Sequence, residues 1–218
     1  MTATSDDPWV MYYVVRKDAP LAREHAMALA GAAAVLCADT LRPTARWAPA
    51  FGAWARRPRK VALRATAEEV ARLRAEADCV CLEEILVALP PCRRSDRSPL
   101  VGDLRPYTDG PRPKDPPPEP EQPAMLYLTR PGVLRTTGKA MAQAGHAALM
   151  CADRLGPRLP QAFHAWREAG RPGRVEDAGE DLWERARPLG VVVADAGLTQ
   201  VAPGTETVLA LPPGIRPG

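Results

Sequence analysis

Two stretches in the C-terminal half place polar side chains where chemistry is possible. Lys139, Gln143 and His146 are spaced by four and three residues, so on a helix they lie on one face. Asp195 follows the apolar run Gly190 to Ala194, and the carboxyl end of a strand is a usual place for ligands in open α/β sheets. Such groups transfer protons and bind negative charge, so we expect a candidate site that combines both stretches.

The chain after Asp195 is rich in residues that allow tight turns. Gly197 and the pair Pro203 and Gly204 favour such turns. We expect these turns to bring Thr199 and Thr207 back toward the aspartate.

The elements that must position these residues follow from the hydrophobic pattern. Met125 to Thr129 is an expected strand, followed by an alanine-rich helix ending near Cys151, a second helix around Phe163 and Trp166, and a closing strand, Val208 to Pro213. Between the second helix and Gly190 we find no clear strand, and Gly173 to Asp177 is interpreted as lacking one.

The N-terminal half repeats this order of elements. Ala26 to Leu41 matches Ala140 to Leu155 at eleven of sixteen positions without a gap. Two further blocks recur in the same order, Ala50 to Trp54 as Ala162 to Trp166 and Leu86 to Pro91 as Val208 to Pro213. The sequence therefore predicts a tandem duplication.

The N-terminal copy has its own expected elements. Val10 to Val15 is the opening strand and Lys60 to Arg64 a middle strand. Thr66 with Glu69 has the spacing of a capping box that opens a helix through Ala75.

This copy lacks the polar residues of the other. His25, Leu29 and Ala32 stand where the second copy has Lys139, Gln143 and His146, and only Leu82 to Glu84 stands in place of the late loop. We expect the N-terminal copy to be catalytically inactive.

A proline-rich segment, Pro106 to Pro123, separates the copies and is expected to be an extended connector. The predicted domains are therefore residues 9–105, a linker of residues 106–123, and residues 124–218. Strands that alternate with helices predict an α/β fold, with two small layered domains whose mixed sheets are flanked by helices. Each domain has an apolar face to cover, so we expect an internal pseudo-dimer, in which the two repeats pair in place of, or in addition to, a homodimer.

Composition bounds the class of protein. A hydrophobic fraction of 46% and a charged fraction of 25% are ordinary for a globular protein, and no apolar run is long enough for a membrane span. The five cysteines have no spacing typical of zinc, so we expect no metal site. The expected compartment is the cytoplasm. Lysine occurs only at positions 17, 60, 114 and 139, which makes each lysine of interest.

The C-terminal half resembles the type II peptidyl-tRNA hydrolases of archaea and eukaryotes. That family has a Gly-Lys-x-x-x-Gln-x-x-His-Ala helix, which matches Gly138 to Ala147 (GKAMAQAGHA). Its late loop, Asp-Ala-Gly-x-Thr-Gln-x-x-Pro-Gly-Thr-x-Thr, matches Asp195 to Thr207 (DAGLTQVAPGTET). The resemblance covers residues 125 to 213 well and residues 9 to 91 weakly.

The resemblance implies hydrolysis of the ester between a peptide and the 3′ ribose of tRNA, without metal or organic cofactor, by a protein that is often a homodimer. It implies that Asp195 orients or deprotonates the water and that Thr199 and Thr207 supply hydroxyl contacts. Lys139 and His146 are then expected at the tRNA end or the oxyanion. Gln143, Gln200 and Thr205 are expected to contact substrate.

Arg56, Arg57 and Arg59 form a basic stretch that is expected either to bind tRNA phosphates, with Trp47 available for stacking, or to be a solvated turn. Thr137 departs from the family, which usually has a basic residue there. With the absent middle strand, this leaves three alternatives: an active peptidyl-tRNA esterase, an inactive binding or regulatory paralogue, and a hydrolase of another acyl or amide substrate.

Overall fold

The structure is a computed structural model that describes residues 7–113, 119, 123–197 and 201–218. The elements of the N-terminal half are β1 (Trp9–Arg16), α1 (Arg23–Leu41), α2 (Ala48–Arg56), β2 (Arg59–Ala65), α3 (Ala67–Glu76), β3 (Val80–Leu82), β4 (Leu86–Arg93), α4 (Pro99–Asp103) and β5 (Arg105–Pro106). Those of the C-terminal half are β6 (Met125–Thr129), α5 (Thr137–Leu155), η1 (Gly156–Arg158), α6 (Pro160–Glu168), β7 (Gly173–Asp177), α7 (Glu180–Ala186), η2 (Arg187–Leu189), β8 (Val191–Ala194) and β9 (Glu206–Leu211).

The two sheets have equivalent topology. In the first, the strand order is β3-β4-β1-β2-β5, and in the second it is β7-β6-β9-β8. Each opening strand pairs in parallel with the strand after the second helix, β1 with β2 and β6 with β7, and antiparallel with the closing strand, β4 or β9. Both sheets are mixed and flanked by helices, as predicted, and the N-terminal one has β5 as an additional edge strand.

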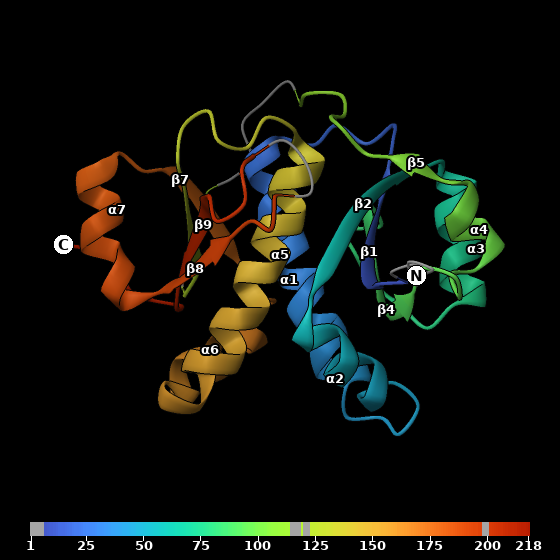
Figure 1. Cartoon of the computed structure of the whole chain (residues 1–218), viewed down its shortest axis with the longest axis horizontal. Coiled ribbons are helices and arrows are strands. Elements are labelled where there is room, and N and C mark those ends of the chain that lie inside the picture. The colour runs from blue at the N-terminus through green and yellow to red at the C-terminus, as the bar shows by residue number, and fades with distance from the viewer. Residues whose placement is uncertain (1–6, 114–118, 120–122, 198–200) are drawn as a thin grey trace, which may run out of the picture.

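The molecule is layered, with the two long helices at its centre (Figure 1). Helices α1 and α5 pack against each other between the two sheets, while α3 and α4 lie outside the first sheet and α7 outside the second. The two helices approach the sheets closely because both contain glycine. A Cβ added at Gly31 would overlap the hydroxyl of Tyr127, and one added at Gly145 would overlap that of Tyr13. Each tyrosine belongs to the other half.

One hydrophobic core joins the halves. The central cluster contains Tyr13 and Ala30 from the N-terminal half with Tyr127 and Ala144 from the C-terminal half, all buried. Two smaller clusters fill the spaces between each sheet and its outer helices. Burial of apolar area at about 25 cal/mol per Å² makes such a shared core a main source of stability, so the halves depend on each other's contacts.

Most predicted elements are present, with longer boundaries. The predicted capping box is confirmed: the Thr66 hydroxyl accepts from the Glu69 N–H at 3.1 Å and the Glu69 carboxylate accepts from the Thr66 N–H at 2.6 Å. The alanine-rich helices run on to Leu41 and Leu155, beyond the predicted ends near Cys37 and Cys151, because neither proline nor glycine occurs in the last turn of either helix.

The expectation that the C-terminal half lacks a middle strand is wrong. Gly173–Asp177 forms β7, which pairs in parallel with β6 from Met125 to Thr129. The residues GRVED carry little apolar pattern, so the strand is defined by main-chain pairing and not by its side chains. At its end, the Thr129 hydroxyl donates to Asp177 at 2.6 Å. The C-terminal sheet is therefore complete.

The start of the proline-rich segment is packed and not a free connector. Tyr107 is buried, and its N–H donates to the Ala62 carbonyl at 2.9 Å. Asp109 accepts from the main-chain N–H of Thr137 at 3.0 Å and from its hydroxyl at 2.5 Å. Thr137, where the family usually has a basic residue, thus anchors this segment at the N-terminus of α5.

Candidate active site

The candidate site is built around Asp195, at the carboxyl end of β8. The side chain is 5% exposed, and the following loop folds back onto it. The Asp195 N–H donates to the Thr205 carbonyl at 2.8 Å, and the Gly204 N–H donates to the Asp195 carbonyl at 2.8 Å. Gly197 and Gly204 have φ values of 74° and 81°, which glycine adopts without strain. The predicted turns are confirmed and fix the carboxylate at the edge of the sheet.

Three donors hold the Asp195 carboxylate. The Lys139 ammonium lies 2.5 Å from Oδ2, and the Gln143 amide donates to the same oxygen. The Gly197 N–H donates to Oδ1 at 2.8 Å. Lys139 and Gln143 come from successive turns of α5, so the predicted helix face does meet the predicted strand end. Oδ1 retains capacity for one more hydrogen bond from a water molecule.

The hydroxyls around the loop bond to the main chain. Thr207 is fully buried, and its hydroxyl donates to the Val193 carbonyl at 3.0 Å. The Thr205 hydroxyl donates to the Ala202 carbonyl at 2.8 Å. Both threonines therefore brace the loop that carries Asp195. The predicted site residues Thr199 and Gln200 lie outside the described residues.

His146 lies on the same helix face but points toward the N-terminal half. Its ring centroid is 6.2 Å from that of Trp54, in an edge-to-face arrangement. Burial is the main cause that lowers the pKa of His146 to about 2, with smaller contributions from Lys60 and Arg154. The imidazole is therefore neutral at physiological pH, and its surroundings are a tryptophan and a lysine of the other half.

Lys60 also faces this site, which the sequence did not reveal. Burial and the ammonium of Lys139 lower the pKa of Lys60 well below its ordinary value, and the Asp195 carboxylate opposes this shift. The only signal in the sequence was the rarity of lysine. Asp109, Thr137 and Tyr107 were missed because their roles depend on how the connector folds back.

At the equivalent corner of the N-terminal half lies an exposed pair of side chains. His25, at the position of Lys139, lies 2.8 Å from Glu83. Glu83 belongs to the three-residue turn, Glu83 to Ile85, between β3 and β4, with φ values of 50° and 54° at Glu83 and Glu84. Both side chains are substantially exposed.

The basic stretch lies at the junction of α2 and β2, directly before Lys60 in the sequence. Arg56 and Arg57 are exposed and Arg59 is half-buried. Trp54 of this stretch is core, because it is 5% exposed and donates to the Arg59 carbonyl at 2.8 Å. Trp47 is only partly available for stacking, since its indole donates to Asp78 at 2.9 Å and the Arg46 guanidinium covers its ring.

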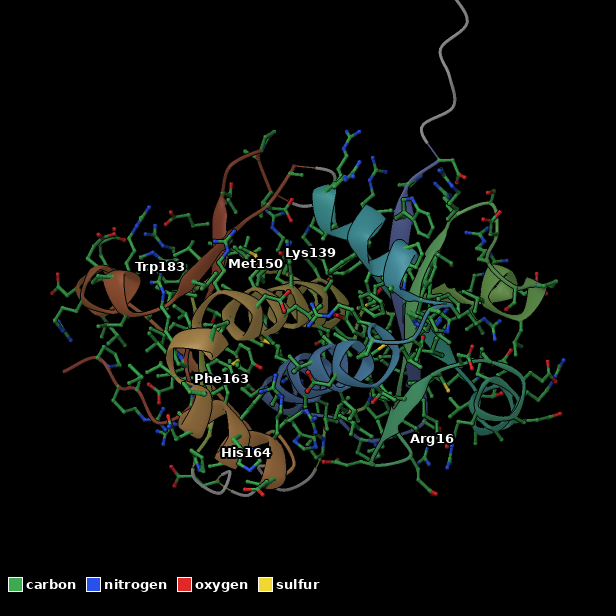
Figure 2. All side chains as sticks on the ribbon, turned by 90° about the horizontal axis from the view of Figure 1, so that it is seen from below. Arg16, Lys139, Met150, Phe163, His164 and Trp183 are labelled. Atoms are coloured by element: carbon green, nitrogen blue, oxygen red, sulfur yellow. The ribbon has the colours of Figure 1, made fainter. Side chains whose placement is uncertain are left out.

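The labelled side chains place the site relative to the rest of the C-terminal half (Figure 2). Lys139 lies on α5, whereas Trp183 lies on α7, on the outer side of the second sheet, and Phe163 on α6. A cavity of about 510 Å³ opens elsewhere, at the ends of β6 and β7. The described residues that line it are Arg23, Glu24, Thr129, Arg130, Gly132, Leu134, Arg135, Val175 and Asp177.

Fold and site together define a small α/β protein with a lysine-paired aspartate at a strand end. Comparison with known proteins agrees with this class. The family model described as "Peptidyl-tRNA hydrolase PTH2" matches residues 125–217. A peptidyl-tRNA hydrolase of Pyrobaculum aerophilum is 42% identical over 99 residues, which cover 41% of this chain and 82% of that protein.

Human "Peptidyl-tRNA hydrolase 2, mitochondrial" is 35% identical over 98 residues, which cover 41% of this chain and 55% of the human protein. The chain thus spans about half the length of this relative. The chain belongs to the peptidyl-tRNA hydrolase PTH2 family, and the family match lies in the half that carries Asp195. None of the described helices is long and apolar enough to cross a membrane.

Proposed function

We propose that the C-terminal half hydrolyses the ester bond of peptidyl-tRNA and so recycles tRNA. The observation that carries this proposal is the Asp195 carboxylate, which Lys139, Gln143 and the Gly197 N–H hold at the carboxyl end of β8. This arrangement lies within the residues that match the family.

The proposed reaction needs no group beyond water and side chains. A water held on Oδ1 of Asp195 attacks the ester carbonyl carbon, and the carboxylate accepts the proton. The carbon–oxygen bond to the 3′ ribose then breaks, and that oxygen takes up the proton. The products are the free peptide acid and tRNA. Lys139 and Gln143 orient the base, while Thr205 and Thr207 keep the loop in place.

Substrate binding is proposed for the residues around this centre. The predicted tRNA contacts are Arg56, Arg57 and Arg59, with Gln200 and Thr205 from the late loop. The positive charge of this stretch favours phosphate binding, and such contacts make affinity depend on salt. Reversing the charge of the three arginines is expected to weaken tRNA affinity and flatten its salt dependence. Unchanged affinity would remove this part of the proposal.

We also propose that the chain is an internal duplication whose halves pair in place of two subunits. The shared core, the equivalent strand orders and the repeated sequence blocks support it. Light scattering of the full chain at the mass of a monomer is expected. A stable dimer built from full chains would contradict the idea that pairing is complete within one chain. For localisation we propose the cytoplasm, although the human relative is named as mitochondrial.

The deciding experiment is release of N-acetylaminoacyl groups from tRNA by the purified full chain, beside Asp195→Asn. Turnover by the parent that the variant lacks supports the esterase. The second candidate function is a tRNA-binding paralogue without turnover. Thr137 favours it, because this position has no basic side chain and the Thr137 hydroxyl donates to Asp109. Bound tRNA without release of the acyl group would select that candidate.

A further inference from the structure

Strand β2 of the N-terminal half packs against α5, the helix that carries Lys139 and Gln143. A Cβ added at Gly138 of α5 would lie 3.4 Å from the Ala62 Cβ of β2. Ala62 belongs to the central core cluster, whereas Val61 and Leu63 on either side belong to or pack against the outer one. Because side chains alternate along a strand, Lys60 points the same way as Ala62, toward α5.

The start of β2 is held in place by a local contact. Trp54, at the end of α2, donates its indole N–H to the carbonyl of Arg59, the residue before Lys60. The same tryptophan packs its ring against His146 of α5. Lys60 is therefore fixed at the interface of the halves, next to the helix face that leads to Asp195.

The equivalent strand of the C-terminal half, β7, has a glycine where β2 has Lys60. The strand registers pair Met11 with Lys60 and Met125 with Gly173, so Gly173 is the counterpart of Lys60. Strand β7 packs against α1, and a Cβ at Gly173 would lie 3.0 Å from the Ala28 Cβ. Each of these two strands therefore packs against the long helix of the other half.

We call this packing, of β2 on α5 and of β7 on α1, the crossed arrangement. The position of the lysine agrees with it. Lysine is kept at position 60, which faces the helix with the polar site, and is absent at position 173, which faces the helix where that site has been lost. A lysine retained only for surface solvation has no reason to follow this rule. The N-terminal half therefore has a polar residue on the strand that faces the helix of the opposite half's site.

We propose that Lys60 of the N-terminal half is a residue of the C-terminal active site, where its amino group donates to the oxyanion that develops on the ester carbonyl. This proposal rests on the proposed peptidyl-tRNA hydrolysis. Lys139 is already paired with Asp195, whereas Lys60 makes no ion pair with any residue that the structure describes. Its amino N–H groups are therefore available to donate to a developing anion beside the pair of Lys139 and Asp195.

Kinetics of the full chain test this role. Lys60→Met is expected to lower kcat by about 100-fold with little change in KM, as for loss of one oxyanion donor. Lys60→Arg should recover part of kcat. Lys17→Met is the matched control, because Lys17 is exposed in the same half, and should retain full turnover. A Lys60→Met variant as active as Lys17→Met would overturn the proposal.

Titration of the lysine side chains by NMR gives a readout that needs no turnover. Burial and Lys139 lower the pKa of Lys60 and Asp195 raises it, so Asp195→Asn should lower the pKa of Lys60 further, with the signal of Lys17 unchanged. If the unmodified chain shows no turnover but Asp195→Asn still lowers the pKa of Lys60, the proposed hydrolysis is wrong and the placement of Lys60 at the site stands. If the pKa of Lys60 is the same in the parent and in Asp195→Asn, Lys60 does not lie at this site, even if the enzyme is active.

Discussion

The two halves share a framework and differ at one corner of their sheets. In the C-terminal half, a buried aspartate at the end of β8 is held by a lysine, a glutamine and a main-chain N–H. In the N-terminal half, the side chains of His25 and Glu83 form an exposed pair beside a tight turn. Sheet pairing is equivalent in the two halves, so it does not depend on which residues stand at this corner.

The largest expected effect separates the two acidic residues at that corner. Asp195→Asn should lower the rate of acyl release by about 1,000-fold, because an amide cannot accept the proton of the attacking water. Glu83→Gln in the N-terminal half should change the rate less than about twofold, since its carboxylate is exposed and paired only with His25. Comparable losses in both variants would mean that the N-terminal corner is active.

A glycine pair tests how the connector docks on α5. A Cβ at Gly138 would overlap the Tyr107 carbonyl, so Gly138→Ala should lower the free energy of unfolding by up to about 3 kcal/mol. Gly52→Ala in α2 is the control, since open space surrounds Gly52, and should stabilise by about 0.5–1 kcal/mol. Denaturant unfolding measures both. Equal stabilities would show that the packed start of the connector contributes nothing.

Two equivalent tryptophans sharpen the comparison between stability and activity. Trp54 donates to the Arg59 carbonyl and Trp166 to the Pro172 carbonyl, each at 2.8 Å. Replacing either by phenylalanine should cost about 1 kcal/mol of unfolding free energy for the lost hydrogen bond. Only Trp54→Phe should also lower kcat, because Trp54 contacts His146. The crossed arrangement would be contradicted by a Trp166→Phe variant with the larger loss of activity.

The free energy of unfolding should depend on pH through His146 of α5. The folded pKa of His146, about 2, lies below the ordinary value of 6.5, so the unfolded chain binds the proton first. The stabilisation is complete above pH 6.5 and is lost as pH falls, at no more than about 1.4 kcal/mol per pH unit. His146→Ala should flatten stability against pH between 6.5 and 5. Its counterpart Ala32 has no such group, and an unchanged slope would count against a neutral buried imidazole.

The helix motif and the late loop were accessible from the sequence because local spacing defines them. Lys139 and Gln143 share a face through the helical period, and Asp195 ends a strand that its own residues predict. The capping box at Thr66 was accessible for the same reason. Strand β7 was not, because its pairing with β6 stabilises a segment whose side chains carry no strand pattern.

What the sequence by itself determined is the order of the elements, the repetition and the polar residues of one half. Only the tertiary structure decided that β2 crosses to α5, that Lys60 joins Asp195 and Lys139, and that His146 turns toward Trp54. The physical reason is that these contacts link residues about 80 to 135 positions apart. No local period encodes them, and they form when two apolar helix faces are buried together.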